Sequence, residues 1–173
     1  MSARDLLAPA FPDDTGEADP AVRAALDAWH ADPARRPEAV AALQGTRVLV
    51  PVVAVLGEVE VDARGLAHDK SADMAAVLMR GRDGRVALLG FTSLAAMAAW
   101  DPEARPVPVA AETAALAAVQ EGAQALVLDL AGPVRFVLEG EDLRAFAAGW
   151  RLARVGDDVV WLGPAVPDSP PVG

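Results

Sequence analysis

Three carboxylates in the alternating stretch Glu58-Val59-Glu60-Val61-Asp62 have a spacing that could hold a hard cation. In an extended backbone alternate residues point to the same side, so the three acidic side chains would project together at intervals of roughly 7 Å. Oxygen ligands of this kind suit calcium or magnesium. The stretch lacks the glycine turn and the terminal glutamate of an EF-hand loop, so a solvated polar face is the alternative interpretation.

His68 is the second place where catalytic chemistry could arise, because Asp69 and Asp73 lie close to it in sequence. A histidine oriented by a carboxylate is the usual general base. A histidine in a polar loop is equally explained as solvated, and His30, at the end of a predicted helix, would complement the helix dipole. One hypothesis is therefore a metal-assisted or carboxylate-dependent enzyme or small-ligand sensor that uses Glu58, Glu60, Asp62, His68 or Asp73.

Other catalytic patterns are missing from the sequence. The chain has no cysteine, which excludes disulfides, thiolate nucleophiles and cysteine-bearing metal sites. Neither Ser71 nor Ser93 lies in a Gly-x-Ser-x-Gly turn, and the glycines at 81, 84 and 90 surround a hairpin instead of leading from a strand into a helix. We therefore predict no catalytic residue and no cofactor.

The charge of the chain argues against two classes of partner. Its formal net charge is −10 and its sequence pI is near 4.5, so its surface repels nucleic-acid phosphates and anionic membranes. The N-terminal residues soon reach Asp13, Asp14 and Glu17, and the most apolar run, 48–56, is far too short to span a bilayer. We expect a cytoplasmic protein. Fourteen of the fifteen basic residues are arginine, with Lys70 the exception, which is typical of a GC-rich bacterial genome.

Helices are predicted from capping residues and from apolar positions three and four residues apart. The first begins at Asp19-Pro20 and ends near Asp32-Pro33. In the alanine-rich fourth helix we expect Leu116 and Val119 to face inward, and we place Trp150 on the last helix. The predicted helices are 20–32, 37–43, 94–100, 112–121 and a segment beginning at 140.

Strands are predicted from runs of valine and leucine bounded by turn residues. Two runs, 73–80 and 85–91, flank a short loop containing Asp83-Gly84 and predict a β-hairpin. The remaining predicted strands are 47–56, 107–109, 125–130, 134–138 and 159–162. The alternation predicts an α/β fold of mixed α+β character, one domain with a mixed β-sheet, hairpins and covering helices. We place this domain at residues 20–162, between a flexible N-terminal segment, 1–19, and a proline-rich flexible tail, 163–173.

Several of these short motifs occur in an order that resembles the SseB N-terminal domain family, named for enhanced serine sensitivity. They are Leu49-Val50-Pro51-Val52-Val53, Lys70-Ser71-Ala72-Asp73-Met74, Phe91-Thr92-Ser93 and Trp100-Asp101-Pro102. The resemblance covers roughly residues 20 to 150 and is strongest to actinobacterial members. It implies a strand that ends in Phe-Thr-Ser before a short helix, and a later strand that meets a turn, here Asp129-Leu130-Ala131-Gly132-Pro133 where the family has an Asn-Pro-Gly-like sequence. It implies an α/β domain with no established reaction or cofactor.

The leading hypothesis is a non-catalytic protein-interaction or regulatory module. We place its binding surface around Phe91, Thr92, Ser93, Trp100 and Asp129, where the resemblance and the turn signals coincide. The four tryptophans, Trp29, Trp100, Trp150 and Trp161, could anchor either the core or an interface. We expect an unknown protein partner, and a homo-oligomer formed through an unpaired sheet edge is a further possibility.

Overall fold

The computed structural model describes residues 11–55 and 73–164. Its helices are α1 (Pro20–Ala31), the 3-10 turn η2 (Pro33–Arg35), α2 (Arg36–Leu43), α3 (Leu94–Trp100), α4 (Ala111–Gln120) and α5 (Gly140–Ala147). Its strands are β1 (Arg47–Val55), β2 (Asp73–Ala76), β3 (Leu78–Arg80), β4 (Val86–Gly90), β5 (Arg105–Ala110), β6 (Ala125–Leu128), β7 (Phe136–Glu139), β8 (Arg151–Val155) and β9 (Asp158–Leu162). These elements form one α/β domain, which confirms the predicted fold class.

Two helices begin where their caps predict. The Asp19 carboxylate accepts a hydrogen bond of 2.8 Å from the Ala21 N–H, and Pro20 occupies the first helical position of α1. The Ser93 hydroxyl accepts from the Ala96 N–H at 3.1 Å and so caps α3. No helix within the described ranges is long and apolar enough to cross a membrane.

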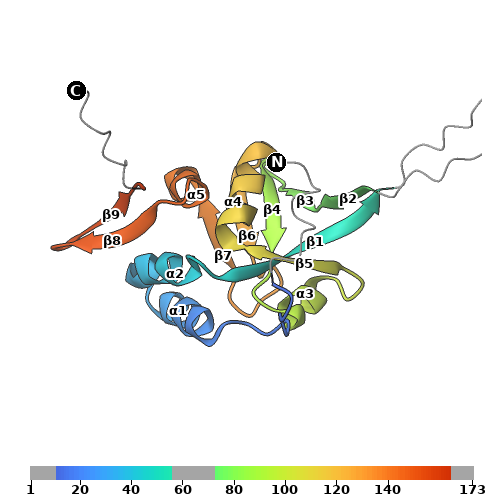
Figure 1. Ribbon diagram of the computed structural model, residues 1–173, viewed down its shortest axis with the longest axis horizontal. Coiled ribbons are helices and arrows are strands. Elements are labelled where there is room, and N and C mark those ends of the chain that lie inside the picture. The colour runs from blue at the N-terminus through green and yellow to red at the C-terminus, as the bar shows by residue number, and fades with distance from the viewer. Residues whose placement is uncertain (1–10, 56–72, 165–173) are drawn as a thin grey trace, which may run out of the picture.

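Two sheets share the centre of the molecule (Figure 1). One is antiparallel with the strand order β2-β1-β5, and the other has the order β3-β4-β6-β7, in which β4 and β6 run parallel. Leu49 of β1 and Phe91, the residue after β4, join them through two backbone hydrogen bonds of 2.8 Å. The two sheets are therefore hydrogen-bonded to each other at the carboxyl end of β4.

The predicted hairpin is confirmed only in its second half. The run 73–80 was expected to be one strand, but β2 pairs with β1 whereas β3 pairs with β4. Val77 lies between them and bonds to both sheets, because its N–H donates to the Pro51 carbonyl at 3.1 Å and its carbonyl accepts from the Leu89 N–H at 3.4 Å. The chain thus passes from one sheet to the other at Val77.

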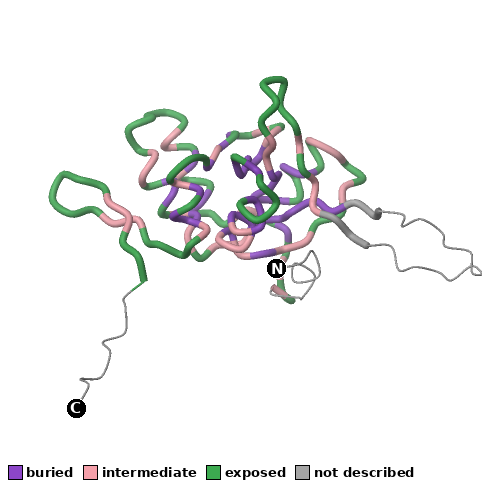
Figure 2. Tube along the Cα trace, turned by 90° about the horizontal axis from the view of Figure 1, so that it is seen from above, coloured by how far each residue is buried: buried purple, intermediate pink, exposed green. Residues whose placement is uncertain are grey.

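The main core lies between the helices and one face of the β3-β4-β6-β7 sheet. Inward residues of the sheet on this face include Leu88, Leu126 and Leu138, and they pack with buried residues of α1, α2, α4 and α5. Figure 2 shows that the buried residues gather in the middle of the molecule. A second buried cluster lies on the opposite face of the same sheet, around Leu89 and Phe91.

Helix α4 contradicts the prediction that Leu116 and Val119 face inward. Its buried residues are Ala111, Ala114, Ala115, Ala117 and Ala118, whereas Leu116 is half-buried and Val119 is 39% exposed. An alanine face lets the helix approach β1, β4 and β6 closely, which larger side chains would prevent. The size of a side chain therefore did not predict which face of this helix is buried.

The last helix also ends earlier than predicted. Helix α5 stops at Ala147, Gly149 takes a φ of +72°, and Trp150 lies outside the helix with 40% of its surface exposed. The chain then forms β8, which sequence analysis did not predict, and β8 pairs with β9. The four tryptophans do not share one role, since Trp29 packs edge-on against buried Phe136.

The alanine face of α4 generates a stability prediction. Replacement of fully buried Ala118 by leucine inserts three carbon atoms into a packed contact, so we expect a loss of about 1–3 kcal/mol in the free energy of unfolding. Val119→Ala, one position away, should change it by less than about 0.5 kcal/mol, because Val119 is exposed. Urea unfolding of both variants measures the difference. A larger loss for Val119→Ala than for Ala118→Leu would contradict this packing.

Candidate functional site

The structure brings most of the predicted site residues together at one end of the mixed sheet. Because β4 and β6 are parallel, their carboxyl ends meet, and Phe91-Thr92-Ser93 follow one strand while Asp129 follows the other. The Asp129 N–H donates to the Gly90 carbonyl at 3.0 Å. Residues 37 positions apart in sequence are thereby placed in contact.

Asp129 and Thr92 form a buried pair. The Asp129 carboxylate accepts from the Thr92 N–H at 2.8 Å and from the Thr92 hydroxyl at 2.7 Å. Burial raises the pKa of Asp129, while the two hydrogen bonds from Thr92 and the charge of Arg23 act in the opposite direction. Asp129 also has a φ of +51°, a conformation that aspartate and asparagine tolerate better than most residues.

The other predicted residues contribute to the same packed junction. Phe91 is fully buried and stacks on Trp100, with ring centroids 5.5 Å apart, and the hydroxyl of buried Ser93 caps α3. Trp100 is half-buried and is the member of the set that reaches the surface most. The junction is thus built mainly from buried residues, namely Phe91, Thr92, Ser93 and Asp129. Their part in binding a partner stays a prediction.

Arg47 is a member of this junction that sequence analysis missed. Its guanidinium, with 10% of the side chain exposed, donates to the Thr92 carbonyl at 2.7 Å, to the Asp14 carboxylate and to the Glu17 carbonyl at 2.7 Å. The Leu94 N–H donates to the Gly16 carbonyl at 2.8 Å. Arg47 therefore ties the segment before α1 to the end of β4, through contacts too distant in sequence for any motif to reveal.

The metal and histidine candidates lie elsewhere. Glu58, Glu60, Asp62 and His68 fall outside the described residues, and Asp73 begins β2. Within 11–55 and 73–164 no group of three or more histidine, aspartate or glutamate residues could hold a metal ion.

An open groove lies on the second face of the β3-β4-β6-β7 sheet, beside the junction. Its floor crosses neighbouring strands, from Met79 to Ala87 to Ala125 in register, with Val137 on β7. The hollow has a volume of about 310 Å³. Two alanines side by side leave this space, because longer side chains flank them: Met79 is opposite Ala87, Glu139 is opposite Ala125, and Val137 is two residues from Glu139 along β7.

Helices cover the two faces of this sheet unequally. Helices α4 and α5 contact β4, β6 and β7 on the core face. On the groove face, residues of α3 pack at the Phe91 end, where Ala96, Met97 and Trp100 join the second buried cluster. Leu130, which follows Asp129, lines the groove, so the groove begins where the junction of predicted residues ends.

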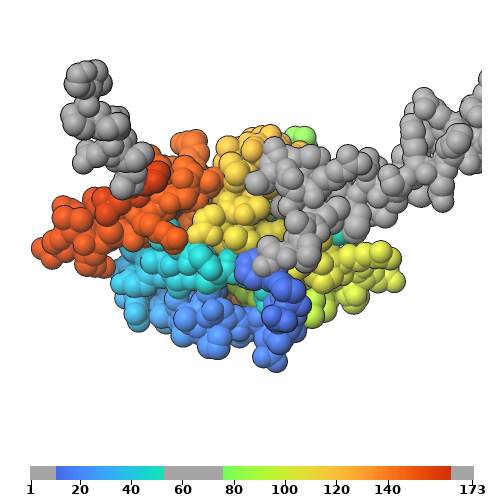
Figure 3. All heavy atoms as spheres, viewed as in Figure 1, coloured from blue at the N-terminus to red at the C-terminus, as the bar shows by residue number. Residues whose placement is uncertain are grey.

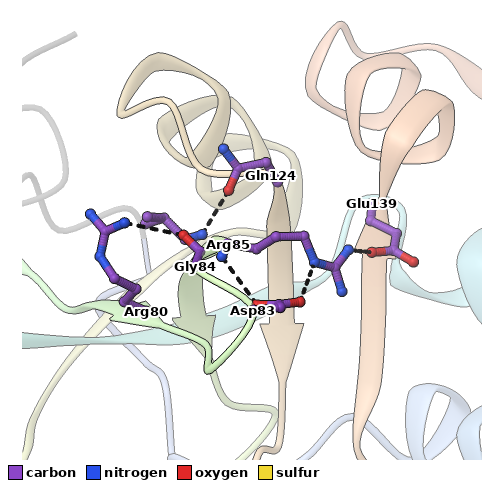
Figure 4. Close-up of polar contacts among 7 residues, drawn as sticks. Arg80, Asp83, Gly84, Arg85, Gln124 and Glu139 are labelled. Atoms are coloured by element: carbon purple, nitrogen blue, oxygen red, sulfur yellow. Dashed lines mark hydrogen bonds and ion pairs between the residues drawn. The ribbon is translucent and has the colours of Figure 1, made fainter.

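The rim of the groove is fixed by Arg85 (Figure 4). Its guanidinium donates to Asp83 at 2.8 Å and to Glu139 of β7 at 2.7 Å, and Figure 4 shows it reaching across from the β3–β4 turn. Arg85 lowers the pKa of Asp83, and the two carboxylates raise the pKa of Arg85. Gln124 holds Val86 with bonds of 2.6 and 2.8 Å. The β3–β4 turn and the start of β4 are thus bonded to Gln124, just before β6, and to Glu139 of β7.

The buried carboxylate generates a prediction about pH. Because the folded-state pKa of Asp129 is raised above its ordinary value of 3.8, the protonated form is favoured by folding. The stability that Asp129 contributes is therefore full below pH 3.8 and is lost as the pH rises through the folded-state pKa. Asp129→Asn keeps both contacts with Thr92 without titrating, so its unfolding free energy relative to wild type should rise over this range. Urea unfolding at a series of pH values measures it.

Asp129→Ala is the matched control for this experiment. Alanine accepts no hydrogen bond from Thr92 and disfavours the positive φ, so this variant should lose about 1–3 kcal/mol in the free energy of unfolding for the buried donor alone. If the unfolding free energies of wild type and Asp129→Asn depend on pH in the same way, burial does not raise the pKa of the Asp129 carboxylate, and the prediction is wrong.

Comparison with known proteins agrees with the order of motifs around this junction. No curated protein and no solved structure gives a significant match to the chain. The family described as SseB protein N-terminal domain matches residues 22–145, a range that includes β1, the Phe-Thr-Ser step, the Asp129 turn and the groove. On that match over most of its length, the chain belongs to the SseB N-terminal domain family.

Proposed function

We propose that this SseB-family domain is a non-catalytic protein-interaction module whose partner binds in the groove on the open face of the β3-β4-β6-β7 sheet. The observation that carries the proposal is the groove itself, an apolar floor of Met79, Ala87, Ala125 and Val137 with a rim held in place by Arg85. Exposed apolar surface with a polar rim is typical of sites that bind other proteins.

The local charge favours an acidic partner segment. Arg80, Arg82 and Arg85 lie at the β3–β4 turn beside Asp83 and Glu139, whereas Arg135 lies at the other end of β7, just before Phe136. Four arginines against these two carboxylates make the region around the groove positive on a chain whose net charge is −10. Arg85 is neutralised by the two carboxylates, whereas exposed Arg135 has no ion-pair partner in the described part of the chain. A segment with an apolar side chain for the alanine hollow and a carboxylate for Arg135 fits this arrangement.

The hydroxyls nearest the groove support a binding role over a catalytic one. Thr92 donates its hydroxyl proton to Asp129, and Ser93 uses its hydroxyl oxygen to cap α3. An activated nucleophile requires a base that accepts its proton while the oxygen stays free to attack a substrate. Thr92 does donate to a carboxylate, but its side chain is buried, as is that of Ser93, so a substrate would not reach either hydroxyl. Both therefore support the packing of the junction that borders the groove.

The test compares partner capture by two arginine variants. Ala87→Arg fills the hollow with a long charged side chain, and Ala24→Arg makes the same change at an exposed position of α1, on the other side of the sheet. We expect a protein that co-purifies with the tagged wild type from the native host at physiological salt, identified by mass spectrometry. It should be retained by Ala24→Arg and lost with Ala87→Arg.

A charge reversal separates the acidic partner from an apolar one. Arg135→Glu should weaken binding of the purified partner, measured by calorimetry, and should reduce its salt dependence. Equal capture by Ala87→Arg and wild type would reject the groove as the site. Loss with Ala87→Arg but no effect of Arg135→Glu would keep the groove and reject the acidic segment.

A further inference from the structure

The β8–β9 hairpin projects from the body of the molecule (Figures 1 and 3). Several of its apolar side chains are exposed. Val155 is 58% exposed, Leu162 is 49% exposed and Val159 is 38% exposed. A two-stranded sheet is only marginally stable in water unless it packs against another element or joins further strands. The hairpin packs against the main core through Leu152 and Trp161, and the apolar side chains that stay exposed are available to a further strand.

One edge of the hairpin, that of β8, is closed at its base. Gln44, which follows α2, donates from its side-chain amide to the Trp150 carbonyl at 2.6 Å and accepts from the Leu152 N–H at 3.2 Å. Its amide group thus bonds the outer edge of β8 as a neighbouring strand would. Trp161 fixes the base of the hairpin, since its ring N–H donates to Asp142 at 3.2 Å.

The outer edge of β9 is open in the described part of the chain. Leu152 is opposite Trp161, and because the Leu152 N–H bonds Gln44, this is a non-hydrogen-bonded pair. The alternation of an antiparallel ladder makes Arg154 and Val159 another such pair. The backbone groups of Val159 and Trp161 consequently point away from β8, and no described residue bonds to them.

Two other outer strands, β5 and β7, are less available for pairing than β9. On β5, Pro106 and Pro108 have no N–H to offer a new strand. On β7, the Val137 carbonyl accepts from Arg36 at 2.9 Å. The five residues of β9 contain no proline, and their sequence Asp-Val-Val-Trp-Leu has high β propensity.

We propose that β9 pairs antiparallel with β9 of a second copy of this chain, about a two-fold axis at Val160. The two residues with outward backbone groups, Val159 and Trp161, lie symmetrically on either side of Val160. Val159 of each copy then forms a hydrogen-bonded pair with Trp161 of the other. The two hairpins become one four-stranded sheet with the order β8-β9-β9-β8.

The side chains are compatible with this register. The partly exposed Val159 comes to lie beside Trp161 of the second copy, and the two Val160 side chains meet at the axis. Asp158 lies opposite Leu162 of the second copy, so no like charges face each other directly. Arg151 pairs with Leu162 in its own hairpin and therefore shares a row with Asp158 of the second copy, roughly 10 Å away across two strand spacings.

A cysteine substitution at the axis tests the register. Val160→Cys puts one thiol in each copy of a chain that has no cysteine, and the two thiols form a non-hydrogen-bonded pair with Cα atoms about 4.5 Å apart, within disulfide range. Under mild oxidation we expect a disulfide-linked dimer of the full-length protein. Val155→Cys is the matched control, because it is more exposed but is opposite Asp158 of its own hairpin.

A proline substitution tests the backbone pairing. The Val159 N–H points outward, so Val159→Pro removes an edge donor without removing a bond to β8. Sedimentation equilibrium over a concentration series should give twice the 17.9 kDa mass of one chain for wild type and for Val159→Thr, and one chain for Val159→Pro. Tryptophan fluorescence of Val159→Pro checks that the hairpin remains formed.

Two results would overturn the proposal. One is a wild-type protein that stays monomeric at every concentration, and the other is cross-linking of Val160→Cys no faster than that of Val155→Cys. The proposed groove lies on another sheet, so Ala87→Arg should leave the dimer intact. Loss of the dimer and loss of partner capture are therefore separate outcomes.

Discussion

The contact between Asp129 and Thr92 is the constraint on which the rest of this structure depends. It joins the carboxyl ends of the two parallel strands at the centre of the mixed sheet. Thr92 is also held from the opposite side, because its carbonyl accepts from Arg47 of the neighbouring sheet. A buried carboxylate, a threonine and an arginine thereby help to fix the relative position of two sheets that are also bonded to each other through the Leu49–Phe91 bridge and through Val77.

The mixed sheet then uses its two faces differently. On the core face, leucines fill the space beneath α4 and α5, and α4 contributes alanines so that it can come close. On the other face the small residues belong to the sheet itself, at Ala87 and Ala125, and no helix of the described chain fills the hollow above them. Alanine therefore allows close packing of α4 on one face of the sheet and leaves a groove on the other face.

Several features that depend on residues close together in sequence were predicted from the sequence. The Asp19 and Ser93 caps and the Gly81–Gly84 turn all lie where expected, because each depends on residues within a few positions. The exchange of sheets at Val77 and the alanine face of α4 depend on neighbours distant in sequence. The end of α5 is a local signal that was missed, because Gly149 takes a positive φ and the Trp150 N–H closes the helix on the Ala145 carbonyl. Strand β8 was likewise missed although Gly156-Asp157 joins it to β9 in a two-residue turn.

The candidate site was partly predictable on the same grounds. The Phe91-Thr92-Ser93 step and the Asp129 turn each follow a strand, as predicted, and the parallel pairing of these strands explains why they meet, while their part in binding stays a prediction. The structure adds that these residues are buried and that the open surface lies beside them, between Met79 and Val137. Both facts follow from the strand register and from side-chain size across four strands. No single segment of the sequence contains that information.

The attachment of Arg47 to Asp14 and Glu17 sets a limit on how this domain can be shortened. The family match begins at residue 22, and α1 begins at Pro20, so either position looks like a natural start. A fragment that starts at Pro20 would retain every described helix and strand, and one that starts at residue 22 would lose only the first two residues of α1. Either would leave a nearly buried guanidinium with the Thr92 carbonyl as its remaining acceptor. The smallest unit that satisfies its own charges therefore starts at or before Asp14, ahead of the first element of regular structure.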